Sequence, residues 1–173
     1  MKSKMPLHEA QAIANNMIYL LKNHCRRVEI AGSIRREKQE IGDIEIVAVP
    51  LFADMFGVST SLSVLDTLDW TDIGTPVKNG TKYKQIALKS GINLDLFIVT
   101  PPAQWGLIYL IRTGPWEFSK RMVTPKQHGG FMPSYLKVKD GAVWSNNHVI
   151  ETPEEDDIFS LYGMSYIEPK DRL

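Results

Sequence analysis

Apolar and polar residues alternate along this chain in patterns that predict both helices and strands. Apolar side chains recur at helical spacing over residues 6–24, which predicts an amphipathic helix. A short apolar run predicts a strand at residues 28–31, and a longer β-branched run predicts another that contains Asp43 and Glu45. Leucines spaced three residues apart predict a second helix over residues 62–68.

Two turn signals come next, each followed by a strand pattern. Asn79-Gly80 is typical of a type I′ turn, in which both central residues have positive φ, and predicts a hairpin into a strand at residues 83–88. A turn at Ser90-Gly91 leads to a strand at residues 92–99, which carries Asp95. The first part of the chain is therefore predicted to be α+β, with a mixed, largely antiparallel sheet and helices.

The pattern changes after two consecutive prolines at positions 101 and 102. Residues 103–112 and 115–128 are predicted to be helical, and a Thr-Gly-Pro turn separates them. We therefore expect two domains, residues 1–101 and residues 102–173.

The second domain is predicted to contain a small sheet and a last helix. Asp140-Gly141 marks the hairpin turn of this sheet. Thr152 is predicted to cap the last helix, with Pro153 at its first position and Glu155 at the capping-box position. The second domain is thus expected to be a small α/β subdomain.

The composition is that of an ordinary globular protein. With 173 residues, 43% of them hydrophobic, the chain can form one full core or two small lobes. A single cysteine, Cys25, rules out an intrachain disulfide framework and suits a reducing compartment. No apolar run approaches the roughly 18 residues of a membrane-spanning helix, so we expect a cytoplasmic protein with no membrane partner.

The charge balance argues against strong binding of phosphates, because 20 basic and 20 acidic residues give a formal net charge of zero. The charges are unevenly distributed, however. Basic residues cluster at residues 26–38, 78–84 and 120–126, whereas an acidic block lies at residues 151–157. A neutral total can therefore hide a basic groove.

Residues 32–49 contain the strongest candidate chemistry. Alternate residues of a strand share a face, so Asp43 and Glu45 point to the same side. Two carboxylates inside an apolar run suggest a divalent metal site, although both could instead be exposed polar positions of an edge strand. The Gly32-Ser33 turn before them can offer backbone N–H groups to a phosphate. Asp95 alternates with leucines, which places it on the polar face of its own strand.

Five features, in this order along the chain, resemble family X DNA polymerases of the polymerase beta type. They are Gly32-Ser33-x-Arg35-Arg36, Asp43-x-Glu45, Asp95, Thr113-Gly114, and the C-terminal Glu168-Pro169-Lys170-Asp171-Arg172. In size the chain is similar to the minimal viral members, which lack the N-terminal lyase and helix-hairpin-helix domains. The resemblance implies a nucleotidyltransferase palm followed by a subdomain that faces the nucleotide and the template.

The resemblance also implies an activity. A nucleoside monophosphate would pass from a dNTP to a primer 3′-hydroxyl on gapped or primer-template DNA, in short-gap repair. Two Mg²⁺ ions, which Mn²⁺ can replace, would be held by Asp43, Glu45 and Asp95, and Asp95 would accept the proton of the hydroxyl. We expect a monomer.

Other residues take on roles through the same resemblance. The residues that it implies for nucleotide binding are Gly32, Ser33, Arg36, Gly42, Thr113, Gly114 and Trp116. Those that it implies for contacts with DNA or the template are Lys82, Lys84 and Lys120. The family also has a cis peptide bond after the glycine of its Thr-Gly turn. A cis bond costs only about 0.5–1 kcal/mol before proline, so we expect Gly114-Pro115 to be cis.

The chain departs from the family pattern at several places, among them Leu7, which stands where larger members carry a phosphate-binding arginine. Glu45 replaces the usual second aspartate, and Ile111-Arg112 replaces an aromatic pair. Two other functions stay open: a nucleotidyltransferase that modifies a protein or a small molecule, and a catalytically impaired DNA-binding module. Trp116 also fits a core aromatic position, and Lys120 also fits a solvated helix position.

Overall fold

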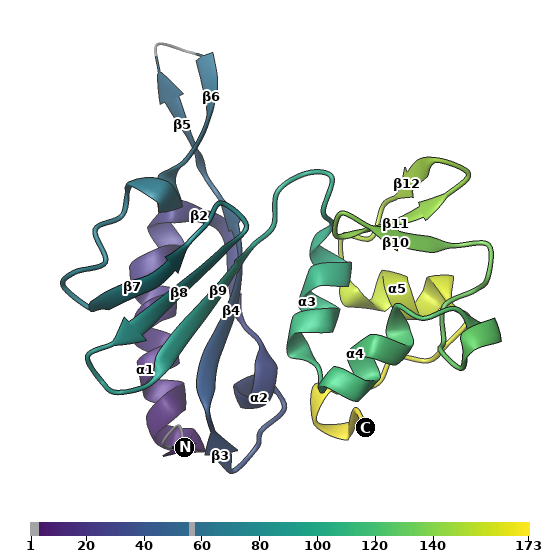
Figure 1. Ribbon diagram of the computed structural model, residues 1–173, viewed down its shortest axis with the longest axis horizontal. Coiled ribbons are helices and arrows are strands. Elements are labelled where there is room, and N and C mark those ends of the chain that lie inside the picture. The colour runs from purple at the N-terminus through teal and green to yellow at the C-terminus, as the bar shows by residue number, and fades with distance from the viewer. Residues whose placement is uncertain (1–3, 56–57) are drawn as a thin grey trace. The chain divides into compact units, whose positions relative to one another are not determined.

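The computed structural model describes residues 4–55 and 58–173 (Figure 1). The chain divides into two compact units, unit 1 (Met1–Ile98) and unit 2 (Val99–Leu173). Both units contain helices and strands. The main sheet is mixed, and most of its strand pairs are antiparallel. The fold is thus mixed α/β and compatible with the predicted α+β class.

Unit 1 is built on a five-stranded sheet. In spatial order its strands are β2 (Cys25–Ile30), β4 (Asp43–Pro50), β9 (Asn93–Ile98), β8 (Tyr83–Leu88) and β7 (Gly74–Asn79). The central pair β4 and β9 is parallel, and the other three pairs are antiparallel. The two strands that carry the predicted carboxylates are therefore direct neighbours.

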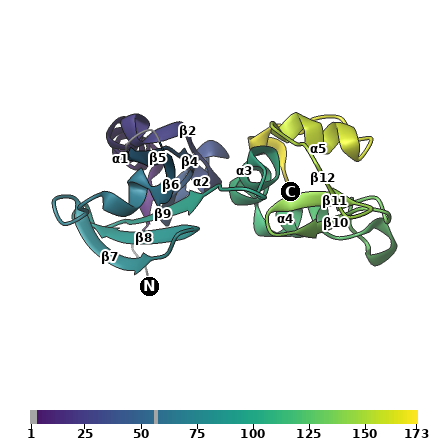
Figure 2. The ribbon, with the colours of Figure 1, turned by 90° about the horizontal axis from the view of Figure 1, so that it is seen from above.

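The core of unit 1 lies between this sheet and α1 (Leu7–Leu21), which runs along one face of the sheet (Figures 1 and 2). Successive side chains of a strand point to opposite faces of the sheet, so every second residue points toward α1 and contributes to the core. The fully buried side chains of Ile44, Ile46, Leu94 and Leu96 belong to this core. The residues between them point to the opposite face, which is where the candidate site lies.

The remaining elements of unit 1 are short. They are β1 (Met5–Pro6), which pairs with β3 (Glu40–Ile41), η1 (Lys22–His24), α2 (Gly32–Arg35), the paired strands β5 (Phe52–Met55) and β6 (Val58–Ser63), and η2 (Val64–Thr67).

Two local predictions for unit 1 are wrong. The helix expected over residues 62–68 is the end of β6 followed by a single 3₁₀ turn, in which Ser63 Oγ accepts a hydrogen bond of 3.2 Å from the Leu65 N–H. The hairpin between β7 and β8 does form, but neither Asn79 nor Gly80 is among the described residues with positive φ. The loop is instead closed by the Gly80 N–H donating to the Tyr83 carbonyl at 2.9 Å.

Unit 2 packs three helices with a small antiparallel sheet. The elements are α3 (Trp105–Thr113), α4 (Trp116–Met122), η3 (Lys126–His128), β10 (Lys137–Lys139), β11 (Ala142–Ser145), β12 (His148–Ile150), α5 (Glu155–Leu161) and η4 (Pro169–Asp171). Its core joins all three helices through Leu107, Leu110, Phe118, Ile158 and Phe159. Asp140 and Gly141 have φ of 52° and 76°, which confirms the predicted hairpin turn.

Helix boundaries in unit 2 differ from the prediction. The second helix ends at Met122, and residues 126–128 form a separate 3₁₀ turn. Glu154, not Thr152, caps α5 and shares a capping box with Asp157. Thr152 is fully buried, and its carbonyl accepts a hydrogen bond of 2.9 Å from the N–H of Gly106 in α3, so its backbone is already held before the helix begins.

The peptide bond between Gly114 and Pro115 is cis, as predicted, and the bond between Pro101 and Pro102 is cis as well. Within residues 4–55 and 58–173, none of the helices has the length and apolar character needed to span a membrane.

Candidate functional site

The three predicted metal-binding carboxylates lie on the face of the sheet opposite α1. Glu45 on β4 is directly opposite Asp95 on β9, and Asp43 is opposite Asn93. Paired residues of adjacent strands point to the same face, as do residues two apart along one strand. The structure therefore places Asp43, Glu45 and Asp95 at neighbouring positions, each of them partly buried.

The Gly32-Ser33 turn adjoins Glu45. The Ala31 N–H donates a hydrogen bond of 2.8 Å to the Glu45 carbonyl, and α2 begins at the next residue. Gly32 has φ of +60°, and a Cβ added there would overlap the carboxylate of Glu45. The glycine thus lets the turn approach the acidic side chain closely, which brings the predicted phosphate-binding turn beside one of the predicted metal ligands.

Asp95 is held by two side chains of β8 that the sequence analysis did not single out. The Tyr83 hydroxyl donates to Asp95 Oδ1 at 2.7 Å, and Gln85 Nε2 donates to the same oxygen at 2.8 Å. The Tyr83 ring stacks on Phe97, with the two ring centroids 5.2 Å apart. Alternation in β8 puts Tyr83 and Gln85 on one face, but only the pairing of β8 with β9 shows that they reach Asp95.

The resemblance implies Mg²⁺ ions held by these three carboxylates. Across the described ranges, no group of three or more His, Cys, Asp or Glu side chains is arranged to hold a metal ion. Asp95 Oδ1 accepts hydrogen bonds from two side chains of β8, and the Glu45 carboxylate lies against Gly32. The donor chemistry fits Mg²⁺, because carboxylate oxygens are its preferred protein ligands, and the three carboxylates lie at adjacent positions of paired strands.

The other predicted residues of unit 1 lie around the same turn. Ser33 is in α2, and Arg36 directly follows it, with its N–H donating to the Gly32 carbonyl at 3.1 Å. Both side chains are partly buried. Gly42 immediately precedes Asp43, and a Cβ added to it would meet open space.

Lys84 is not available to DNA, and this part of the prediction is wrong. Its side chain is only 2% exposed and lies on the core side of β8, where its ammonium group pairs with Asp66 at 2.7 Å. The ammonium also donates to Asn79 Oδ1 at 2.6 Å. A buried cation needs such partners, so Lys84 has a structural role, whereas Lys82 is exposed in the loop before β8.

The predicted nucleotide-facing residues of unit 2 lie where α3 ends and α4 begins. Thr113 and Gly114 are buried, and Gly114 has φ of 72°. Trp116 is 68% exposed, which excludes the alternative of a core aromatic. The ammonium group of Lys120 lies 4.9 Å from the centroid of the Trp116 ring, at cation–π distance.

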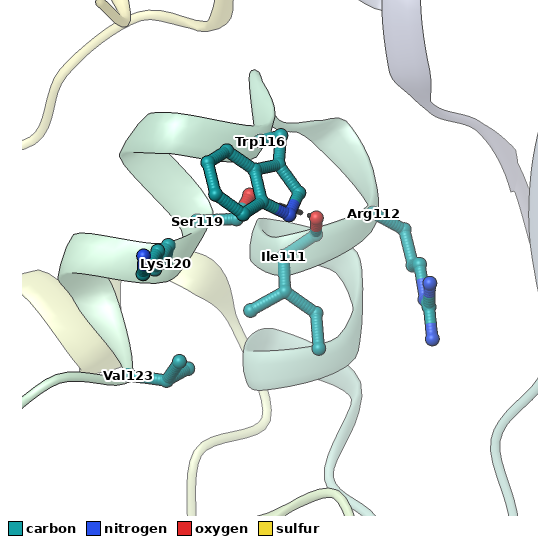
Figure 3. Close-up of a pocket in the computed structure, with 6 residues that line it drawn as sticks. All are labelled: Ile111, Arg112, Trp116, Ser119, Lys120 and Val123. Atoms are coloured by element: carbon teal, nitrogen blue, oxygen red, sulfur yellow. Dashed lines mark hydrogen bonds between the residues drawn. The ribbon is translucent and has the colours of Figure 1, made fainter.

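Trp116 and Lys120 border two pockets. The first, of about 320 Å³, is shown in Figure 3 and is lined by Ile111, Arg112, Trp116, Ser119, Lys120 and Val123. The second, of about 280 Å³, is lined by Trp116, Glu117, Lys120, Arg121, Thr124, His128 and Gly129. Both lie near the lower limit of the usual size range for small-ligand pockets.

Two contacts hold α4 against neighbouring parts of unit 2. The Ser119 hydroxyl donates to the Ile111 carbonyl at 2.8 Å, which joins α4 to the last turn of α3 (Figure 3). The guanidinium of Arg121 stacks 4.0 Å from the centroid of the Phe131 ring. The exposed Trp116 therefore belongs to a helix that is held in place by the contacts of both Ser119 and Arg121.

Two further residues have structural roles. Arg172, from the C-terminal motif, is buried, and its Nη1 pairs with Glu155 Oε1 at 3.0 Å. Cys25 is buried, and burial raises the pKa of its thiol to about 11. Since the thiolate is the reactive form, Cys25 is protonated and a poor nucleophile at neutral pH.

No protein-family model and no curated protein matches this chain. The chemistry and placement of the residues above therefore carry the functional proposal.

Proposed function

We propose that this chain is a DNA-directed DNA polymerase of the nucleotidyltransferase type that fills short gaps in DNA repair. One observation carries the proposal: Glu45 lies directly opposite Asp95, with Asp43 on the same face of the sheet and Gly32 against the Glu45 carboxylate. Carboxylates on paired strands beside a glycine turn suit a reaction that joins metal ions to a triphosphate. Unit 1 would then be a nucleotidyltransferase palm, and unit 2 the subdomain that faces the nucleotide and template.

In the proposed reaction, the primer 3′ oxygen forms a bond to the α-phosphorus of a dNTP. The bond from that phosphorus to the β-phosphate oxygen breaks, and pyrophosphate leaves. Asp95 would accept the proton of the 3′-hydroxyl. Asp43 and Glu45 would bind both Mg²⁺ ions, and Asp95 would bind one. Bound Mg²⁺ supplies charge stabilisation to the reacting phosphate and lowers the pKa of a coordinated hydroxyl.

The triphosphate would lie against the turn that begins α2. Ser33 and the backbone N–H groups of this turn would donate to phosphate oxygens, and Arg36 would balance the charge that develops on the leaving group. Glycine at position 32 suits this role, because a side chain there would collide with Glu45, and the turn can lie close to that carboxylate only without one. Gly42 would leave the approach to Asp43 open, as the empty space around its Cβ position suggests.

The roles proposed for unit 2 concern the sugar, the base and the template. Thr113 and Gly114 would contact the sugar and Trp116 the base, while Lys120, with Lys82 of unit 1, would contact DNA. The exposure of Trp116 and the pockets beside it support these assignments. They also favour DNA over a protein or small-molecule acceptor, which needs no exposed aromatic and basic pair for stacking and phosphate contact.

A primer-extension gel tests the proposal. A labelled primer on gapped DNA is incubated with four dNTPs and Mg²⁺ or Mn²⁺, and we expect short, template-directed extension that requires the metal. Asp43→Asn and Asp95→Asn should abolish it while circular dichroism stays native. Retained turnover in either variant would remove the carboxylate assignment.

Other outcomes, followed with a labelled dNTP and a DNA-binding measurement beside the labelled primer, point to other functions. Addition to a lone single strand, with no effect of template sequence, would indicate a terminal transferase. Labelling of a protein or small molecule without transfer to DNA would indicate the first alternative. Binding to DNA without any transfer would indicate an impaired DNA-binding module.

A further inference from the structure

The carboxylate of Asp95 accepts two side-chain hydrogen bonds on the same oxygen. The Tyr83 hydroxyl and Gln85 Nε2 approach Asp95 Oδ1 at 2.7 Å and 2.8 Å. Both donors belong to β8, which pairs with β9 on the side away from β4. Neither bond occupies Oδ2.

We infer that Tyr83 and Gln85 are positioning residues that fix the Asp95 carboxylate so that Oδ2 is presented to the metal and the primer hydroxyl. This inference rests on the proposed function, in which Asp95 is a ligand and the proton acceptor. Groups that hydrogen-bond to a metal ligand set its orientation, and their loss typically weakens metal affinity or activity about 10- to 100-fold.

The geometry of the strands explains how the orientation is set. Asp95 has Gln85 as its pairing partner on β8 and Glu45 as its pairing partner on β4. Two donors on the β8 side hold Oδ1 there, which turns Oδ2 toward the side of Glu45. A carboxylate with one oxygen fixed loses less rotational freedom when the other oxygen binds a metal.

Tyr83 is itself held in place, as a positioning residue must be. Its ring stacks on Phe97 with the planes inclined at 27°, and the ammonium group of Lys78 lies 5.4 Å from the ring centroid. The hydroxyl therefore reaches Asp95 from a ring that is supported on its face. Tyr83→Phe would remove the hydroxyl and keep this ring contact.

A purely structural explanation must be separated from the positioning role. Glu45 and Asp95 are like charges directly opposite each other, an arrangement that destabilises a sheet, and two donors on Asp95 would reduce this cost. In that case the loss of a donor would lower the melting temperature and leave catalysis and metal affinity unchanged.

The experiment compares Tyr83→Phe and Gln85→Met with two matched controls. Tyr19→Phe removes a hydroxyl from a residue of α1 that is 71% exposed, and Gln11→Met removes an amide whose bond is to Asn15 on the same helix. For each protein, Mn²⁺ affinity is measured by electron paramagnetic resonance, kcat and KM for dNTP by primer extension on gapped DNA, and the melting temperature by circular dichroism.

We expect each β8 variant to weaken Mn²⁺ binding and to lower kcat about 10-fold or more, with little change in the KM for dNTP, while both controls match the wild type. Wild-type Mn²⁺ affinity and kcat in both β8 variants would overturn the inference, whatever their melting temperatures. If the wild type transfers no nucleotide to any DNA, the proposed function fails. The Mn²⁺ titration still decides the inference then: weaker binding in the β8 variants supports it, and equal or absent binding overturns it.

Discussion

The carboxylate of Glu45 occupies the space into which a side chain at position 32 would extend, so only glycine fits at Gly32. The backbone adds a second requirement, because Gly32 has φ of +60°, where residues with a Cβ are strained. The turn between β2 and α2 is thus tied to the acidic strand by a close approach and not only by the chain connection.

Gly32→Ala is therefore expected to lower the free energy of unfolding by at least about 1–2 kcal/mol, the cost of the left-handed conformation alone. Denaturant unfolding measures this change. Gly42→Ala is the matched control, because a Cβ at Gly42 meets open space and its φ is not positive. Equal losses in the two variants would contradict the close approach at Gly32.

A double-mutant cycle separates the two constraints at this turn. Glu45→Ala removes the carboxylate that overlaps the added methyl group, so it should recover part of the stability lost in Gly32→Ala. The part that remains is the backbone strain. Strictly additive changes would mean that Glu45 does not restrict position 32.

The length of Glu45 has a consequence for activity. Aspartate at this position would carry the carboxylate one methylene shorter and withdraw it from the Gly32 turn. Because a displacement of about 1 Å in a reacting assembly can cost up to about 100-fold, we expect Glu45→Asp to lower the primer-extension rate. Glu29→Asp on β2, an exposed position opposite Val47, is the control. A rate that rises in Glu45→Asp would show that Glu45 is a weakened ligand.

Local patterns predicted the parts of the fold that depend on alternation. The strands that carry Asp43, Glu45 and Asp95 form where β-branched and apolar residues alternate with polar ones. The register that sets Glu45 opposite Asp95 depends on pairing between segments distant in the chain, which no local pattern encodes. The contact of Tyr83 and Gln85 with Asp95 follows from the same long-range pairing and was missed for this reason.

Two errors have local causes. Lys84 alternates with Ile86 and Leu88, so the pattern already placed it on the core side of β8, but its charge suggested a surface contact. The leucines near residue 65 have helical spacing, but only Leu65 lies in the 3₁₀ turn, whereas Leu62 belongs to β6 and Leu68 has an extended backbone. In both cases a residue type or spacing was consistent with more than one environment, and packing decided between them.

The buried ion pair of Lys84 and Asp66 predicts an asymmetric response to mutation. Asp66→Ala leaves the ammonium group of a side chain only 2% exposed with a single neutral partner, so we expect a loss of about 3 kcal/mol in the free energy of unfolding. Lys84→Met replaces the buried cation with an apolar side chain and leaves Asp66, whose side chain is 24% exposed, accessible to water. Its loss should be smaller.

Chemical denaturation of the two variants gives this comparison. Asp72→Ala, at an exposed acidic position after η2, serves as the control and should stay close to the wild type. A greater loss in Lys84→Met than in Asp66→Ala would mean that packing of the lysine stem, and not its charge, is what this contact contributes.

The last prediction concerns how DNA is held. Phosphate contacts release counterions, so the logarithm of affinity falls linearly with the logarithm of salt concentration, by about 0.9 for each phosphate neutralised. A formal net charge of zero implies few such contacts, hence weak binding and low processivity. Fluorescence anisotropy of a labelled gapped duplex, titrated at several salt concentrations, measures this slope.

Single variants distinguish the kinds of contact. Lys82→Ala and Lys120→Ala should each reduce the slope by about 0.9, as the loss of one phosphate contact requires. Trp116→Ala should weaken binding without changing the slope, because stacking on an exposed ring releases no counterions. Lys84→Met should change neither quantity, since its ammonium group is buried against Asp66. A reduced slope in Lys84→Met would contradict its burial, and an unchanged slope in Lys120→Ala would place the DNA elsewhere than at α4.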